Sequence, residues 1–250
     1  MKIKRNIFTK LLNRYATDYF ACSIEAGKCL YGQKTKSQKN IEIIHNAIDT
    51  NNFLFDSETR KKTRKSCNIE NLFTLIHVGM FTEAKNHEFI IKVFKEINKK
   101  QPNSCLVLVG DGPLRENIET LSNNIGLKNK VKFLGELENV SNYLMAADCF
   151  IFPSKFEGLG MAVIEAQVSG LKCWVSHSVP KETNLFGQID FLDINITPES
   201  WADAILANNN KRLTLTSQEV FESGYEIKKE ALKLKELYLE KISGNKKAKN

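Results

Sequence analysis

A loop that carries two glycines between two glutamates is the segment of this sequence best suited to chemistry. Glu157 is followed by Gly158 and Gly160, and seven residues separate Glu157 from Glu165. The glycines let a ligand approach bare backbone N–H groups, and a helix that begins directly after them favours an anionic phosphate. Carboxylates suit the sugar hydroxyls that flank the phosphates of a nucleotide sugar. The alternative is an ordinary helix N-terminus with an acidic first turn and a solvent-facing Glu165.

The elements that must position this loop alternate, from residue 71 onward, between short apolar runs and longer stretches of helical period. The runs that predict strands are Leu72–Val78, Cys105–Val109, Val131–Leu134, Cys149–Phe152 and Leu171–Val175. The segments that predict helices are Asn86–Lys99, Leu114–Asn124, Ser141–Ala147, Met161–Val168 and Pro198–Ala207. This order predicts the α/β class, with a doubly wound parallel sheet that binds its ligand in the loops after the strands.

The two ends of the chain follow a different pattern. Tyr15–Gly32 contains a helical patch, and Ile41–Ile44 predicts a strand that leads into a polar, basic stretch. At the other end, Val220–Ile242 predicts one long helix, and the tail Gly244–Asn250 is expected to fray. We therefore predict three parts, at residues 1–48, 49–219 and 220–250.

Composition excludes several classes of protein. Apolar residues make up 42% of the chain and charged residues 26%, which argues against wholesale disorder. No stretch approaches the length of a membrane-spanning helix. The six cysteines form no C-x-x-C pair, so zinc and redox motifs are unsupported. Cys105, Cys149 and Cys173 each open a short apolar run, which predicts buried apolar residues in a reducing compartment.

Positive charge is concentrated near the N-terminus. Residues 1–70 hold 14 basic and 7 acidic residues, so the whole net charge of +7 belongs to them. The densest run is Arg60–Lys65. Nucleic acid or a phospholipid surface is one interpretation of this run. A solvated helix or linker face is the favoured one, because no aromatic residues interleave the charges, and no nucleic-acid partner is expected.

The glycine loop and its flanks resemble one enzyme family. Residues 146–170, AADCFIFPSKFEGLGMAVIEAQVSG, resemble the donor loop and E-x7-E motif of family 4 retaining glycosyltransferases with the GT-B fold, especially bacterial exopolysaccharide-type members. Further segments resemble the family in the right order: His77–His87 (HVGMFTEAKNH), Leu106–Pro113 (LVLVGDGP), Val131–Val140 (VKFLGELENV) and Ser176–Glu182 (SHSVPKE). His45–Asp49 (HNAID) resembles the hinge between the two GT-B domains. The likeness covers roughly residues 15–242.

The resemblance implies roles for single residues. Lys85 would pair with the donor diphosphate, Glu157 would hold hydroxyls of the transferred sugar, and Glu165 would accept hydrogen bonds from the ribose. Backbone groups would do the rest: Gly158, Gly160, Met161 and Ala162 would cradle the phosphates, Gly135, Glu136 and Leu137 would pair with the base, and Gly79 would allow close approach. No metal is implied, since Lys85 and the helix dipole would neutralise the leaving diphosphate.

The function that follows from the resemblance is transfer of a sugar from a nucleoside diphosphate, with UDP favoured, to a surface or exopolysaccharide glycan. The reaction would retain the anomeric configuration and need no metal or cofactor besides the donor. The acceptor would be a glycan or a lipid-linked oligosaccharide. The protein would be cytoplasmic, with peripheral contact at the inner face of the membrane, where the basic N-terminal residues meet anionic lipid.

Two departures from the family pattern matter. Met80 stands where many members have arginine, which removes one charge-assisted contact at the diphosphate, worth about 1.5–3 kcal/mol. Residues 1–48 would be only a helical remnant and hinge of the N-terminal acceptor domain, and 49–219 the Rossmann-like donor-binding domain. The leucines of the C-terminal crossing helix would then be partly exposed. A truncated nucleotide-sugar-binding module, or one half of a split transferase with a separate N-terminal half as partner, is therefore the alternative function.

Overall fold

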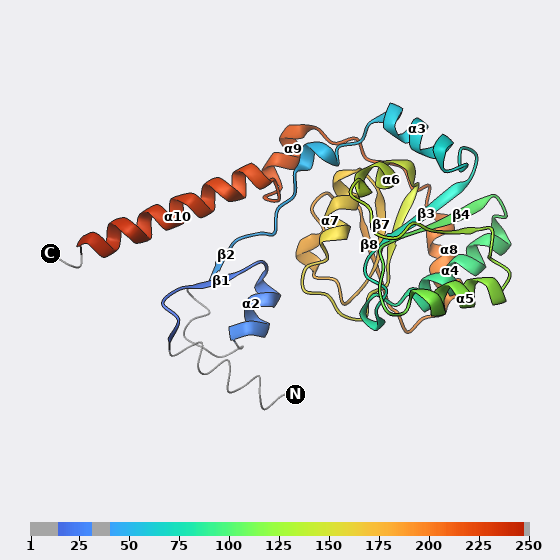
Figure 1. Cartoon of the computed structure of the whole chain (residues 1–250), viewed down its shortest axis with the longest axis horizontal. Coiled ribbons are helices and arrows are strands. Elements are labelled where there is room, and N and C mark those ends of the chain that lie inside the picture. Colours follow the sequence, from blue (N-terminus) through green and yellow to red (C-terminus); the bar gives the residue numbers. More distant parts are fainter. Residues whose placement is uncertain (1–14, 32–40, 248–250) are drawn as a thin grey trace. The chain divides into compact units, whose positions relative to one another are not determined.

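The computed structural model describes residues 15–31 and 41–247 of the chain (Figure 1). It divides into two compact units, which are described separately. One comprises residues 51–217, and the other comprises residues up to 50 together with residues from 218. The predicted site lies wholly within the first unit.

Residues 51–217 form a six-stranded parallel sheet in the order β5-β4-β3-β6-β7-β8. The strands are β3 (Phe73–Val78), β4 (Ser104–Val109), β5 (Val131–Phe133), β6 (Cys149–Phe152), β7 (Lys172–Ser176) and β8 (Ile189–Leu192). The five predicted strands are confirmed, and the edge strand β8 was missed. Chain order runs outward in opposite directions from β3 and β6, which pair Leu75 with Cys149. Such a switch point leaves a crevice at the carboxyl ends of the strands, where α/β sheets bind ligands.

Helices cover both faces of this sheet (Figure 1). One layer holds α4 (His87–Lys100), α5 (Arg115–Asn124) and α8 (Pro198–Ala207). The other holds α3 (Ser57–Ser66), α6 (Val140–Ala146) and α7 (Met161–Val168). Two apolar cores fill the spaces between the layers, one around Phe94 and Trp201 and the other around Phe150 and Val163. The predicted doubly wound α/β class is thus confirmed. Short 3-10 turns are found at η2 (Thr50–Asn52), η3 (Glu83–Lys85) and η4 (Lys181–Thr183).

The basic run at residues 60–65 belongs to α3, which the Asp56 side chain caps by accepting from the Thr59 N–H at 2.7 Å. Lys61, Lys62 and Lys65 are exposed, as expected of a solvated face. Arg60 and Arg64 instead turn inward and donate to Asp148 and to the carbonyl oxygens that end α6. The prediction of a wholly solvated run is therefore wrong for the two arginines. Cations at a helix C-terminus satisfy carbonyls that have no intrahelical partner.

The other unit contains β1 (Tyr19–Ala21), α2 (Ile24–Tyr31), β2 (Ile41–Ile43) and α10 (Ile227–Lys247), preceded by α9 (Ser217–Glu222). The predicted single helix over 220–242 is corrected: the chain breaks between α9 and α10 at Gly224, which has φ +84°. The helical patch predicted within Tyr15–Gly32 is confirmed by α2, and the strand predicted from Ile41 is confirmed by β2. The α10 leucines Leu232 and Leu239 are exposed, as expected. The tail that was expected to fray from Gly244 is helical up to Lys247, and residues 248–250 lie outside the described residues.

Within the described ranges, none of the helices combines the length and the apolar character that crossing a bilayer demands.

Candidate functional site

Glycines join the loops after β3, β4 and β5 at the carboxyl edge of the sheet. The Gly79 N–H donates to the Val109 carbonyl at 2.9 Å, and the Gly110 N–H donates to the Gly135 carbonyl at 2.8 Å. A side chain on Gly110 would collide with the Gly79 carbonyl, and a Cβ on Gly112 would lie 2.7 Å from the Phe81 nitrogen. The close backbone packing brings the predicted residues Gly79 and Gly135 to one edge.

Lys85 and Glu157 form an ion pair at this edge. The Lys85 Nζ donates to Glu157 Oε1, although the two residues are 72 positions apart in the chain. The loops that carry them are tied together, because the Lys155 N–H donates to the Ala84 carbonyl at 2.8 Å. The Glu157 side chain is only 8% exposed, so its charge needs this partner. The ammonium has three donors, and those that Glu157 does not take remain for a ligand.

The Lys85 stem runs past Gly79, and its ammonium lies 4.7 Å from the centre of the Phe152 ring. A Cβ on Gly79 would lie 3.4 Å from two Lys85 carbons and 3.0 Å from His77 Nε2. The absence of a side chain at Gly79 therefore gives room to the lysine as well as to a ligand. This second reason for the glycine was not expected from the sequence.

The helix α7 begins directly beside the ion pair. Gly160 is its N-cap residue, with φ +84°, a left-handed conformation that glycine adopts without strain. The N–H groups of Met161 and Ala162 open the helix and have no intrahelical acceptor. A Cβ added to Gly158 would meet nothing within 4 Å, so open space lies beside that residue. Residues 158–162, which were predicted to cradle the phosphates, thus form a turn that leads directly into the N-terminus of α7.

Glu165, about a turn further along α7, borders a cavity of about 460 Å³. Within the described part of the chain its carboxylate forms neither a hydrogen bond nor an ion pair, and burial raises its pKa to about 7. The alternative of a solvent-facing Glu165 is therefore wrong. A partly buried carboxylate without a partner is costly, and a ligand that donates hydrogen bonds would relieve that cost.

The cavity beside Glu165 is lined mostly by residues that the sequence analysis did not single out. Besides Glu165 it is lined by Asn52, Phe53, Glu138, Asn139, Val140, Ser141 and Asn142. The residues predicted to meet the base lie directly before Glu138 in the chain. Gly135 accepts from the Gly110 N–H, Glu136 is exposed, and Leu137 packs against the core. The polar run at residues 138–142 could have been noticed, because it follows a strand, but Asn52 and Phe53 carry no such signal.

Two buried histidines lie beneath Lys85. The Nδ1 of His77 donates to the Ile151 carbonyl at 2.9 Å, because a carbonyl can only accept. Within the described residues, His77 Nε2 and both ring nitrogens of His87 have no hydrogen-bond partner. Burial lowers the pKa of His77 well below its usual value and that of His87 to about 4, and nearby Lys85 adds to both effects. Both rings are therefore neutral near pH 7, which leaves Lys85 as the local positive charge.

The described residues contain no group of three or more side chains suited to hold a metal ion. Metal independence stays a prediction, as do the roles of the individual site residues.

Comparison with known proteins adds sequence and structural relatives. Residues 59–207 match the model of the family described as "Glycosyl transferases group 1". The chain is 31% identical over 201 residues to the glycosyltransferase EpsF of Bacillus subtilis, covering 80% of this chain and 52% of EpsF. It is 28% identical over 249 residues to the capsular polysaccharide biosynthesis glycosyltransferase CapH of Staphylococcus aureus, covering 96% of this chain and 65% of CapH. The chain thus spans about half to two thirds of these relatives.

The fold is also found among solved structures. A structure of Anabaena HepE in complex with UDP and glucose superimposes with a TM-score of 0.79 at 19% identity, covering 94% of this chain and 66% of HepE. This likeness concerns the fold, in which a parallel α/β sheet carries ligand loops at its carboxyl edge. The family match covers more than half of the sequence, including every residue of the predicted site. The chain belongs to the glycosyl transferases group 1 family.

Proposed function

We propose that residues 51–217 bind a nucleoside diphosphate sugar, with UDP as the nucleotide, and that the sugar is transferred to a hydroxyl of a surface glycan. One observation carries this proposal: the Lys85–Glu157 ion pair lies beside the open start of α7, and the unpartnered Glu165 borders a nucleoside-sized cavity further along the same helix. In such a donor the diphosphate lies between the transferred sugar and the ribose. The cation and the helix N-terminus suit the diphosphate, and the carboxylates of Glu157 and Glu165 suit the hydroxyls of the two sugars.

The diphosphate would be held by the remaining donors of Lys85 and by the backbone N–H groups of Met161 and Ala162. The N-terminus of α7 adds about half a positive charge. When the bond between the sugar C1 and the phosphate oxygen breaks, the electron pair stays on the diphosphate. Donors aimed at that oxygen stabilise the transition state more than the ground state, which accelerates transfer.

The two glutamates would fix the sugars on either side of the diphosphate. Glu157 would accept from hydroxyls of the transferred sugar while keeping its contact with Lys85, so the same carboxylate orients both the cation and the sugar. Glu165 would accept from the ribose hydroxyls. The acceptor oxygen forms the new bond to C1, and its proton passes to the leaving phosphate, so no separate base is required. Retention of configuration and independence from metals belong to this proposal.

The acceptor would be a glycan or a lipid-linked oligosaccharide. The reaction would take place at the inner face of the cytoplasmic membrane. The relative CapH, which is named for capsular polysaccharide biosynthesis, supports a polysaccharide acceptor.

A second candidate function is a nucleotide-sugar-binding module, or one half of a split transferase. The observation in its favour is that the described residues contain one six-stranded sheet, while the unit outside residues 51–217 holds only a two-stranded one. In this candidate, residues 51–217 bind the donor, and transfer depends on an acceptor domain supplied by a separate chain.

Calorimetric titration of the full chain with UDP tests the donor site. Binding that is lost in Lys85→Ala, and kept in the surface control Lys92→Ala, supports the proposal, whereas absence of UDP binding by the wild-type chain overturns it. Release of UDP from UDP-sugars then separates the two candidates. Turnover by the chain alone favours the transferase, and binding without turnover favours the binding module.

A further inference from the structure

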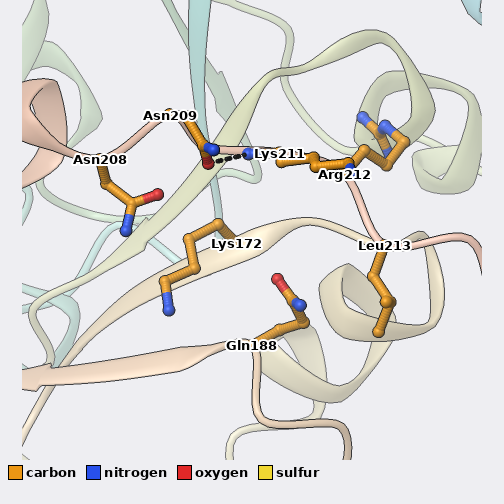
Figure 2. Close-up of a pocket in the computed structure, with 7 residues that line it drawn as sticks. All are labelled: Lys172, Gln188, Asn208, Asn209, Lys211, Arg212 and Leu213. Carbon is orange, nitrogen blue, oxygen red and sulfur yellow. Dashed lines mark hydrogen bonds between the residues drawn. The ribbon is translucent and has the colours of Figure 1, made fainter.

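A second polar cavity lies at the opposite edge of the sheet from the donor site. Lys172 begins β7, Gln188 directly precedes β8, and residues 208–213 follow α8 across these strand starts. Seven of these residues line a cavity of about 330 Å³ (Figure 2): Lys172, Gln188, Asn208, Asn209, Lys211, Arg212 and Leu213. Because β7 ends at Ser176, the two edges are about 13 Å apart along this strand. The proposed function makes no use of this cavity.

Hydrogen-bond donors dominate this cavity. The side-chain oxygen of Asn208 accepts from the Asn210 N–H at 2.8 Å, and that of Asn209 accepts from the Lys211 N–H at 3.0 Å. Both amide oxygens are thus used within the loop, which leaves the amide NH₂ groups to a ligand. Figure 2 shows Lys172, Gln188 and Asn208 extending toward one space from the strands and the loop.

The charge of the cavity is positive. No acidic residue is among its lining residues, and Lys211 forms no ion pair within the described part of the chain. Lys172 pairs with Asp190 of β8 at 3.1 Å, so one carboxylate outside the lining competes for its ammonium. An anionic ligand could therefore pair with the Lys211 ammonium without competition, whereas it would compete with Asp190 for the Lys172 ammonium.

The loop that carries these donors is held in place from behind. The Arg212 guanidinium turns away from the cavity (Figure 2) and donates to the carbonyls of Leu144, Met145, Ala147 and Ser169. Asn210 accepts from the Trp174 indole at 3.0 Å and donates to the Ile205 carbonyl at 2.7 Å. Such anchoring fixes the donors before a ligand arrives, and preorganisation lowers the entropic cost of binding.

We propose that this cavity binds a small phosphate-bearing anion, held by the ammonium groups of Lys172 and Lys211 and by the amide N–H groups of Asn208 and Asn209. A phosphate offers several acceptor oxygens and negative charge, which match a donor-lined, positively charged space. The volume is at the small end of ligand sites, so it suits a phosphate ester rather than a nucleotide.

The test is titration of the full chain with inorganic phosphate at constant ionic strength, followed by the NMR signals of the Asn208 and Asn209 side-chain amides. We expect saturable shifts with a dissociation constant of about 1 mM. Lys211→Gln should weaken binding about threefold to fivefold. Asp190→Asn should tighten it, because Lys172 loses its competing carboxylate. The exposed control Lys128→Gln should change nothing.

Linear, unsaturated shifts, or equal affinities in Lys211→Gln and Asp190→Asn, overturn the proposal. The donor site does not enter this result, since Lys85→Ala should leave these shifts unchanged. Two further arms identify the source of the phosphate. Saturable shifts with glucose 1-phosphate indicate a soluble ester, whereas Lys211-dependent cosedimentation with phosphatidate-containing vesicles, absent with pure phosphatidylcholine, indicates a lipid headgroup.

Discussion

Replacement of Glu165 by glutamine should make the protein more stable at high pH, relative to wild type, while damaging donor binding. Burial raises the pKa of Glu165 from 4.5 to about 7. A carboxyl group whose pKa is higher in the folded state contributes stability below its unfolded pKa, and this contribution is lost as pH rises through the folded pKa. Each pKa unit corresponds to 1.36 kcal/mol, so the full loss between about pH 4.5 and pH 8 is about 3 kcal/mol.

Water in the adjoining cavity reduces this figure, and we expect a change of about 1–3 kcal/mol. Glu165→Gln removes the titration, so the difference in unfolding free energy between variant and wild type should grow by this amount from pH 5 to pH 8. Urea denaturation measures it through the fluorescence of Trp174 and Trp201, both buried in the same unit. The glutamine itself can change the unfolding free energy by an amount that does not depend on pH. This amount cancels when the difference between variant and wild type at pH 8 is compared with that at pH 5.

The exposed Glu182→Gln serves as the matched control and should track the wild type at every pH. If Glu165→Gln also runs parallel to the wild type, the carboxylate is not desolvated and the reasoning about the cavity fails. The same titration should appear in binding. Ribose hydroxyls favour the ionised carboxylate, so the affinity of the wild type for UDP should rise about tenfold or more between pH 5.5 and pH 8. In Glu165→Gln only the smaller rise caused by the second ionisation of UDP itself, at about pH 6, should remain.

Three further predictions concern the phosphate cradle. Lys85→Met should lower the free energy of unfolding by about 1–3 kcal/mol in urea denaturation, because it leaves the nearly buried Glu157 unpaired. The double variant Lys85→Met/Glu157→Gln should regain most of that stability without regaining UDP binding. If the double variant stays as unstable as the single one, the ion pair is not the stabilising contact. Met80 is 59% exposed beside this site, and Met80→Arg should tighten UDP binding about tenfold by calorimetry, whereas the uncharged Met80→Gln should not; equal effects would remove charge as the cause. Gly160→Ala should lower stability by about 1–2 kcal/mol, because the backbone at this position is left-handed. Gly158→Ala should keep the stability of the wild type and weaken UDP binding, because its methyl group enters the open space meant for the ligand. Loss of stability in Gly158→Ala, or unchanged stability in Gly160→Ala, would contradict these two roles.

The sequence predicted the fold well where apolar burial determines it. β3, β4 and β6 are covered on both faces, so their residues form nearly continuous apolar runs that are easy to recognise. β8 is an edge strand in which Asp190 interrupts the apolar residues, and such a short pattern resembles a loop. The break before α10 depends on Gly224, a single residue within a stretch that is otherwise helical in character.

The site was predictable in its residue types but not in its environment. Lys85 and Glu157 were each recognised from local motifs, yet their ion pair depends on how two distant loops meet. The cavity beside Glu165 is lined in part by Asn52 and Phe53, which approach α7 only in the folded chain. The inward orientation of Arg60 and Arg64 likewise requires the carbonyl oxygens of α6 as acceptors. Sequence periodicity carries no information about such tertiary partners.

A crystal structure of the full chain with bound UDP tests the central claim most directly. The account predicts that the diphosphate lies against residues 158–162 within reach of Lys85, and that the ribose hydroxyls contact Glu165 at the wall of its cavity. Density for UDP elsewhere, including the cavity at Lys172, or a Glu165 side chain turned away from the bound nucleotide, would contradict it.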